Sequence, residues 1–222
     1  MNFSRPIRHW RIGETTYELG RRSWVMAIVN LTPDSFYAPS RTPAEPSAVV
    51  ERAEAALAAG ADILDLGAES TRPGSAALGA AEEQERLLPA LEAVRRQFPR
   101  ALLSVDTRHG ATARRAIGAG ADIINDVSGL AEGELAEACV QSGSGLVLMH
   151  TRGEFATMHR MPPLQDPLAT VEAGLEAIAA RAVTLQRTQG QIQRGRSKRR
   201  QPRGRAGIDR RLHRDLCSNL GG

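Results

Sequence analysis

The chain has 222 residues, 41% of them hydrophobic, 24% charged and 4% aromatic, which excludes a disordered or fibrous chain and an aromatic stacking platform for single-stranded nucleic acid. The formal net charge of +4 is the sum of two segments with opposite charge. Residues 187–222 hold 11 basic and 2 acidic side chains, whereas residues 1–186 hold 18 basic and 23 acidic side chains. These segments carry net charges of +9 and −5, so we expect a folded domain over 1–186 and a basic, disordered tail over 187–222.

Short apolar runs and helical segments alternate along residues 24–186. Predicted strands cover 24–29, 61–66, 101–105, 122–124 and 145–149, and predicted helices cover 47–59, 80–97, 111–117, 132–141 and 167–186. This alternation is typical of βα units on a parallel sheet. Residues 59–65 (AGADILD) closely match residues 119–125 (AGADIIN), and such repetition favours a TIM (β/α)8-type barrel, with about five of its eight units present.

Two further features limit the cofactors and the location. Cys139 and Cys217 provide neither a disulfide framework nor a C-x-x-C metal motif, and no G-x-G-x-x-G follows the first strand. The sequence contains no apolar signal segment and no apolar run of the roughly 18–20 residues that a membrane span needs. We therefore expect a cytoplasmic protein with no membrane partner.

Polar residues follow the predicted strands where each strand ends. They are Asn30, Asp65, Asp106, Asn125 with Asp126, and His150. In βα barrels the carboxyl ends of the strands carry the active site, so these side chains are expected to converge. Each also has a structural reading: Asp106 and Asp126 could cap the helices that follow, and His150 could be a buried histidine.

Three sets of residues suggest a particular chemistry. The loop at residues 69–74 (ESTRPG) offers hydroxyls, backbone N–H groups and the guanidinium of Arg72, which suit a phosphate group. Asn30 and Asp34 offer hard oxygen ligands of the kind that Mg²⁺ accepts beside phosphates. Asp106 and Asn125 offer a carboxylate and an amide, which can bind the donor–acceptor edge of a heterocycle.

The same segments, in the same order, resemble the motifs of dihydropteroate synthases. The matching segments are residues 26–36, 60–74, 104–107, 120–129 and 148–153 with 157–158, and residues 10–20 resemble the hairpin that closes the floor of that barrel. The resemblance implies a folate-synthesis transferase that joins 6-hydroxymethyl-7,8-dihydropterin pyrophosphate to 4-aminobenzoate and releases pyrophosphate.

Site residues also follow from this resemblance. Asn30 would ligate Mg²⁺, Thr71 and Arg72 would hold the pyrophosphate, and Asp106 and Asn125 would bind the pterin. Asp106 and Arg72 are the residues expected to take part in catalysis. The resemblance further implies that the intact family forms homodimers.

The sequence departs from the family pattern in several places. Ala68 replaces a glycine before Glu69, and residues 37–40 (YAPS) replace the family's SDGG. After residue 186 the family's Asp-Pro-Gly strand, its substrate-binding lysine and its final Arg-x-His motif have no counterpart; Lys198 is the sole lysine, and Arg211–His213 comes too early in the chain. A frameshift or truncation would explain this change.

Two alternatives remain open from the sequence alone. One is the pterin-binding domain of a methyltetrahydrofolate methyltransferase, although the ESTRPG loop favours a substrate with pyrophosphate. The other is a non-catalytic barrel fragment whose basic tail binds polyanions. For the chain as it stands we expect little synthase activity and low solubility, with an apolar inner face that includes Ile28, Leu64, Leu103, Ile124 and Leu148 exposed to water.

Overall fold

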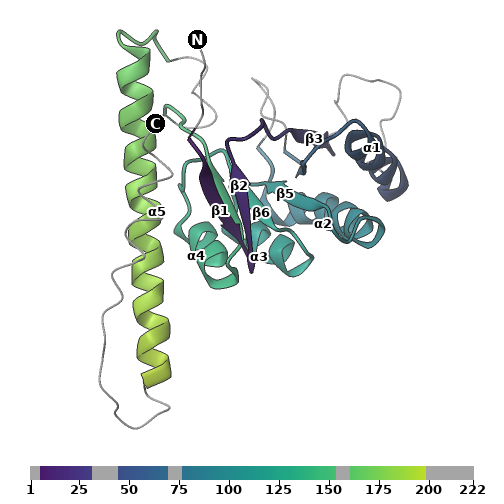
Figure 1. Ribbon diagram of the computed structural model, residues 1–222. Coiled ribbons are helices and arrows are strands. Elements are labelled where there is room, and N and C mark those ends of the chain that lie inside the picture. Colours follow the sequence, from purple (N-terminus) through teal and green to yellow (C-terminus); the bar gives the residue numbers. More distant parts are fainter. Residues whose placement is uncertain (1–5, 32–44, 70–76, 154–160, 199–222) are drawn as a thin grey trace.

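The structure is a computed structural model that describes residues 6–31, 45–69, 77–153 and 161–198 (Figure 1). A parallel sheet contains five strands in chain order, β3-β4-β5-β6-β7. Their bounds are β3 Met26–Asn30, β4 Ile63–Gly67, β5 Leu102–Asp106, β6 Ile123–Asp126 and β7 Gly145–Leu148. The helices between and after them are α1 Pro46–Ala58, α2 Ala80–Gln97, α3 Gly110–Gly118, α4 Gly133–Ser142 and α5 Pro167–Lys198. The five predicted βα units are therefore confirmed.

The helices and one face of the sheet enclose the main core. Helices α1 to α4 lie side by side (Figure 1) and pack on the sheet face that carries Leu64, Leu103 and Ile124, each 0% exposed. Because strand residues alternate between faces, the opposite face carries Ile28, which is paired in register with Asp65. Ile28 is 72% exposed at the β3 edge.

The expected composition of the inner face was therefore wrong in four of five positions. Leu64, Leu103, Ile124 and Leu148 pack in the helix-facing core, and Ile28 alone lies on the inner face. The apolar runs identified the strands but did not show which residues of each strand face the helices and which face the inner side of the sheet. Their orientation is fixed by the polar residues Asp65 and Asp106, which the register places on the same face as Ile28.

An antiparallel hairpin closes the amino-terminal end of the sheet. It consists of β1 (Arg8–Ile12) and β2 (Thr15–Leu19), and Ile12 forms a second apolar cluster with Ile63 and Ile123, the first residues of β4 and β6. Gly13 N–H donates to the Gly143 carbonyl at 2.8 Å. The hairpin thus covers the floor, as the sequence predicts.

The repeated GAD segments form the same junction twice. Asp62, before β4, accepts hydrogen bonds from Arg22 and from the Val25 N–H at 2.9 Å. Asp122, before β6, accepts from Arg95 at 2.6 Å and from the Leu103 N–H at 2.9 Å. In both copies an aspartate ties its own strand to the preceding one, and the Arg22 guanidinium lowers the pKa of Asp62.

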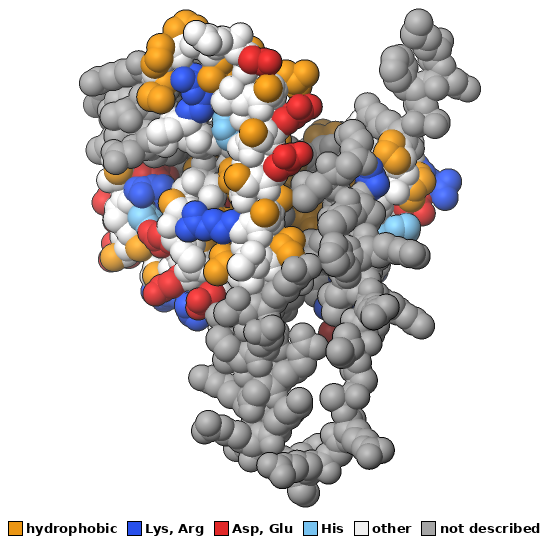
Figure 2. Space-filling model, turned by 90° about the vertical axis from the view of Figure 1, so that its left-hand side faces the viewer, with side chains coloured by type: hydrophobic (Ala, Val, Ile, Leu, Met, Phe, Trp, Pro, Cys, Tyr) orange, Lys and Arg blue, Asp and Glu red, His pale blue; other side chains and the backbone are white. Residues whose placement is uncertain are grey.

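Helix α5 is longer than the sequence predicts. It continues to Lys198 rather than ending near residue 186, in a segment without proline and rich in helix-compatible glutamine and arginine. Ile178 packs beside Gly129, whereas Leu168, Val171 and Leu175 are exposed. Figure 2 views the side on which α5 lies and shows apolar side chains between charged ones there. Residues 199–222, the rest of the predicted tail, lie outside the described residues.

Within the described ranges, no helix combines the length and apolar character needed to cross a membrane.

Candidate functional site

Three polar side chains meet near the carboxyl ends of adjacent strands. Asp65 on β4, Asp106 on β5 and Asn125 on β6 lie on the inner face of the sheet, and Asp106 and Asn125 are paired in register. The Nδ2 atom of Asn125 donates to Oδ2 of Asp65 at 3.0 Å, across the intervening strand. The predicted convergence of strand-end residues is thus confirmed for these three residues.

The electrostatic character of the cluster is unusual. Burial raises the pKa of Asp106 to about 7, and the negative charges of Asp65, Glu83, Glu69 and Asp126 act in the same direction. Burial also raises the pKa values of Asp65 and Glu83. At neutral pH, Asp106 therefore exists in comparable amounts as an acid, which donates a hydrogen bond, and as a carboxylate, which only accepts.

Glu83 is a member of the site that sequence reasoning missed. It lies on α2, is 0% exposed, and its Oε2 accepts a hydrogen bond from the Thr107 hydroxyl at 2.8 Å. Burial raises the pKa of Glu83, and hydrogen bonds from Thr112 and Thr107 act in the opposite direction. The only signal in the sequence is its position on the apolar side of a helix, one turn before Leu87, which is also fully buried.

A clamp of charged residues joins two loops beside the cluster. Arg108 binds Glu69 through Nε at 2.9 Å and Nη2 at 3.2 Å, which is a bidentate geometry. The Leu78 N–H donates to Glu69 at 3.0 Å, and a ring nitrogen of His109 lies 3.0 Å from the Leu78 carbonyl. The clamp fixes the two ends of the segment that contains Thr71 and Arg72. These two predicted anion-binding residues themselves lie outside the described residues.

Two of the strand-end residues have structural roles instead. Asp126 accepts hydrogen bonds from the Ser128 N–H at 2.8 Å and the Leu130 N–H at 2.6 Å, and so shapes the loop after β6. His150 packs against Gly174 of α5, where an added Cβ would lie 2.1 Å from the imidazole. Asp126 therefore shapes a loop rather than capping α4, whose N-cap residue is Glu132, and His150 is partly rather than fully buried.

Asn30 offers a metal only part of a site. It is exposed at the end of β3, in register with Gly67, which is in turn paired with Asp106. Its amide oxygen is a donor type that Mg²⁺ accepts, and Mg²⁺ commonly uses one or two protein oxygens together with phosphate oxygens and water. In the described part of the chain, no group of three or more His, Cys, Asp or Glu side chains could hold a metal. Asp34 lies outside that part.

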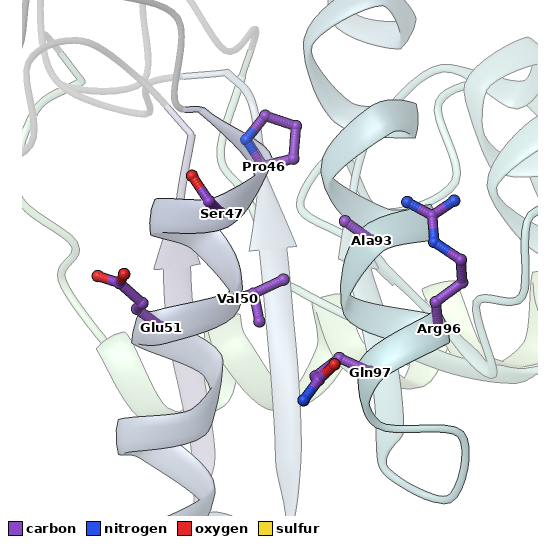
Figure 3. A pocket seen from close by; sticks show the side chains of 7 residues that line it. All are labelled: Pro46, Ser47, Val50, Glu51, Ala93, Arg96 and Gln97. Carbon is purple, nitrogen blue, oxygen red and sulfur yellow. The ribbon is translucent and has the colours of Figure 1, made fainter.

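A separate open groove of about 530 Å³ lies between α1 and α2. Its lining residues include Ser47, Glu51 and Arg96 (Figure 3). Because α1 and α2 cover the helix-facing side of the sheet, this groove is not part of the Asp65–Asp106–Asn125 site on the other face.

Comparisons with known proteins agree with the motifs. The profile of the family described as "Pterin binding enzyme" matches residues 26–190. A dihydropteroate synthase from Synechocystis is 37% identical over 156 residues, which is 70% of this chain and 53% of that protein. Dihydropteroate synthase from Yersinia pestis, solved with a sulfonamide drug, aligns with a TM-score of 0.72 at 34% identity over 80% of this chain and 63% of that one. The Burkholderia cenocepacia dihydropteroate synthase, solved with 7,8-dihydropteroate, aligns with a TM-score of 0.67 at 35% sequence identity. This alignment covers 81% of this chain and 60% of that one.

The likeness covers the whole described sheet but only part of each relative. The chain spans about half the length of the curated relatives it matches. The matched segment includes β3 to β7 and the residues Asp65, Asp106 and Asn125. By this match over most of its length, the chain belongs to the pterin-binding enzyme family.

Proposed function

We propose that the chain binds a dihydropterin through Asp106 and Asn125 and provides this part of a dihydropteroate synthase site. The observation that carries the proposal is the Asp65–Asp106–Asn125 cluster at the carboxyl ends of three parallel strands. A carboxyl group and an amide side by side offer a donor and acceptors to the edge of a flat heterocycle. The Burkholderia cenocepacia relative, solved with 7,8-dihydropteroate, supports a pterin as that heterocycle.

The proposed reaction is a substitution at the pterin methylene carbon. The carbon–oxygen bond breaks, the departing pyrophosphate takes the electron pair, and the amine of 4-aminobenzoate attacks the resulting cation and then loses a proton. Thr71 and Arg72 would bind the pyrophosphate, with the guanidinium as a bidentate partner. The ionised form of Asp106 would stabilise the positive charge that develops on the ring system.

Magnesium is the proposed cofactor of the complete reaction, with Asn30 as its protein ligand. When bound, Mg²⁺ would offset negative charge on the departing pyrophosphate. The exposed amide of Asn30 leaves room for water and phosphate oxygens around such an ion. A cytoplasmic location and a homodimeric assembly also belong to this proposal.

Isothermal titration calorimetry with 6-hydroxymethyl-7,8-dihydropterin pyrophosphate tests this function. The unaltered chain should bind this compound, and Asp106→Ala should weaken the affinity by about tenfold or more, because ring donors lose their partner. Glu54→Gln, an exposed change on α1, serves as the control and should bind like the unaltered chain. Absence of binding to the unaltered chain, or equal affinities for Asp106→Ala and the control, would contradict the proposal.

A further inference from the structure

The imidazole ring of His109 lies between two groups from different loops. Its Nε2 is 3.0 Å from the carbonyl oxygen of Leu78, which precedes α2, and its Nδ1 is 3.3 Å from Oε1 of Glu132, which precedes α4. The side chain of His109 is 13% exposed, so these two groups rather than water are its main partners. The ring therefore links the loop after β4 to the loop after β6.

Both partners of the ring can only accept a hydrogen bond. The other oxygen of Glu132, Oε2, accepts from the Gly110 N–H at 2.7 Å; this bond lowers the pKa of Glu132, and the hydrogen bond and charge of His109 act in the same direction. Glu132 is therefore a carboxylate at neutral pH. A neutral imidazole has one N–H and can donate to one partner, whereas the protonated ring has two and can donate to both. The observed arrangement is satisfied in full only by the imidazolium.

The charges that surround the ring are mainly negative. Glu83 on α2 interacts with it electrostatically, and Glu132 and Glu134 lie at the start of α4. The neighbouring guanidinium of Arg108 forms a bidentate ion pair with Glu69. The ring thus faces carboxylates on two helices, and the nearby positive charge has its own partner.

The backbone of Leu78 joins this ring to the loop that the proposed function assigns to the pyrophosphate. The Leu78 N–H donates to Glu69 Oε1 at 3.0 Å, so the two ends of that loop are held together. The Leu78 carbonyl accepts from Arg108 Nη2 at 3.3 Å and lies within hydrogen-bonding distance of His109. Holding the ends of a loop reduces the ordering that ligand binding would otherwise require.

We propose that His109 is a positioning residue whose protonated ring ties the pyrophosphate-binding loop to the start of α4, so that the affinity for pyrophosphate contains a component that is lost as the ring releases its proton. This inference rests on the proposed function. Histidine side chains exchange a proton between about pH 5 and 8. Above that range the ring keeps one N–H, and either Leu78 or Glu132 then faces a ring nitrogen that cannot donate.

Calorimetry with inorganic pyrophosphate at pH 6 and pH 8 compares the unaltered chain with His109→Gln. The unaltered chain should bind about fivefold more tightly than His109→Gln at pH 6 and less than about 1.5-fold more tightly at pH 8, because the neutral ring makes only one of the two hydrogen bonds. Taking the ratio at each pH cancels the ionisation of pyrophosphate itself and of Asp106, which both proteins share. The control is His9→Gln, which alters an exposed histidine of β1 and should give a ratio near one at both pH values.

Glu132→Gln should reverse the pH dependence. The Gly110 N–H holds the oxygen of the new amide, so the amide N–H faces Nδ1 of His109. The neutral ring can then accept at Nδ1 and donate at Nε2, whereas the protonated ring meets a donor with a donor. Relative to the unaltered chain, Glu132→Gln should bind pyrophosphate about threefold more weakly at pH 6 and more tightly at pH 8.

The outcomes separate this inference from the proposed function. An unaltered chain that binds no pyrophosphate at either pH overturns the proposed function and the inference with it. Binding with the same ratio to His109→Gln at both pH values overturns the inference alone, because a structural role of His109 would weaken binding equally. If His109→Gln does not fold, Glu132→Gln decides: an affinity that is reduced to the same extent at pH 6 and pH 8 overturns the inference.

Discussion

Replacing Asp106 with asparagine should stabilise the folded chain at pH 8 and change its stability little near pH 4. Burial raises the pKa of Asp106 to about 7, compared with 3.8 for an ordinary aspartate. Between these values the folded state holds a proton that the unfolded state has released. The unaltered chain therefore loses stability as the pH rises through this window, and it remains at the lower level above pH 7.

The size of the effect follows from the separation of the two pKa values. Each pKa unit corresponds to about 1.4 kcal/mol, so a difference of about three units corresponds to a penalty of about 4 kcal/mol above pH 7. An asparagine has nearly the same shape and does not ionise. The Asp106→Asn chain should avoid up to this amount at pH 8, which is a large fraction of the 5–15 kcal/mol typical of a folded domain.

Urea unfolding followed by circular dichroism between pH 4 and pH 8 measures this difference. The free energy of unfolding of Asp106→Asn minus that of the unaltered chain should rise with pH and level off above pH 7. The control Glu54→Gln removes an exposed carboxylate from α1 and should give a small difference with little pH dependence. A difference for Asp106→Asn that is equal at pH 4 and pH 8, or that is destabilising at pH 8, would refute the reasoning.

Three further predictions concern other parts of the molecule. Gly110→Ala should lower the free energy of unfolding by about 1–3 kcal/mol, because the added Cβ would lie 2.6 Å from the Cβ of Glu134. Gly118→Ala, in the same helix, should raise the free energy of unfolding by about 0.5–1 kcal/mol, because its added Cβ meets nothing within 4 Å. Urea unfolding of both variants compares these two effects. Arg95→Met should cost about 2–3 kcal/mol in the same assay, since the guanidinium donates to carbonyls and a carboxylate at the amino ends of two strands, and a loss under 0.5 kcal/mol would contradict this. Arg72→Lys should weaken the binding of inorganic pyrophosphate measured by calorimetry, because an ammonium group lacks the bidentate fork, and equal affinities would exclude Arg72 as the anion ligand.

Sequence periodicity was sufficient to predict the five βα units and their order. Periodicity did not predict which residues of each strand face the helices, and it did not predict where α5 ends. The apolar runs placed Leu64 and Leu103 in strands but on the wrong face, because a run of consecutive apolar residues does not say which members face the helices. The length of α5 was underestimated because no proline or capping residue marks its end near residue 186.

The candidate site was predictable where its residues follow strands directly. Asp106 and Asn125 stand at strand ends and were assigned to heterocycle binding from their position. The hydrogen bond from Asn125 to Asp65 was not predicted, because it joins residues 60 positions apart on strands that are not adjacent. Glu83 was missed for a related reason: an acidic residue on a helix is usually solvated, and only the packing of α2 on the sheet buries it.

The paired junctions at Asp62 and Asp122 suggest how such a sheet can grow by repetition. In each, the aspartate before a strand accepts a hydrogen bond from a backbone N–H at the start of the preceding strand: that of Val25, immediately before β3, or that of Leu103, in β5. The later unit of each pair thus supplies the aspartate that accepts the hydrogen bond. The preceding strand supplies a backbone N–H as the donor, and this group is present whatever the side chain. A duplicated unit would carry its own means of attachment, so new units could be added without first changing the sequence of the strand that receives them.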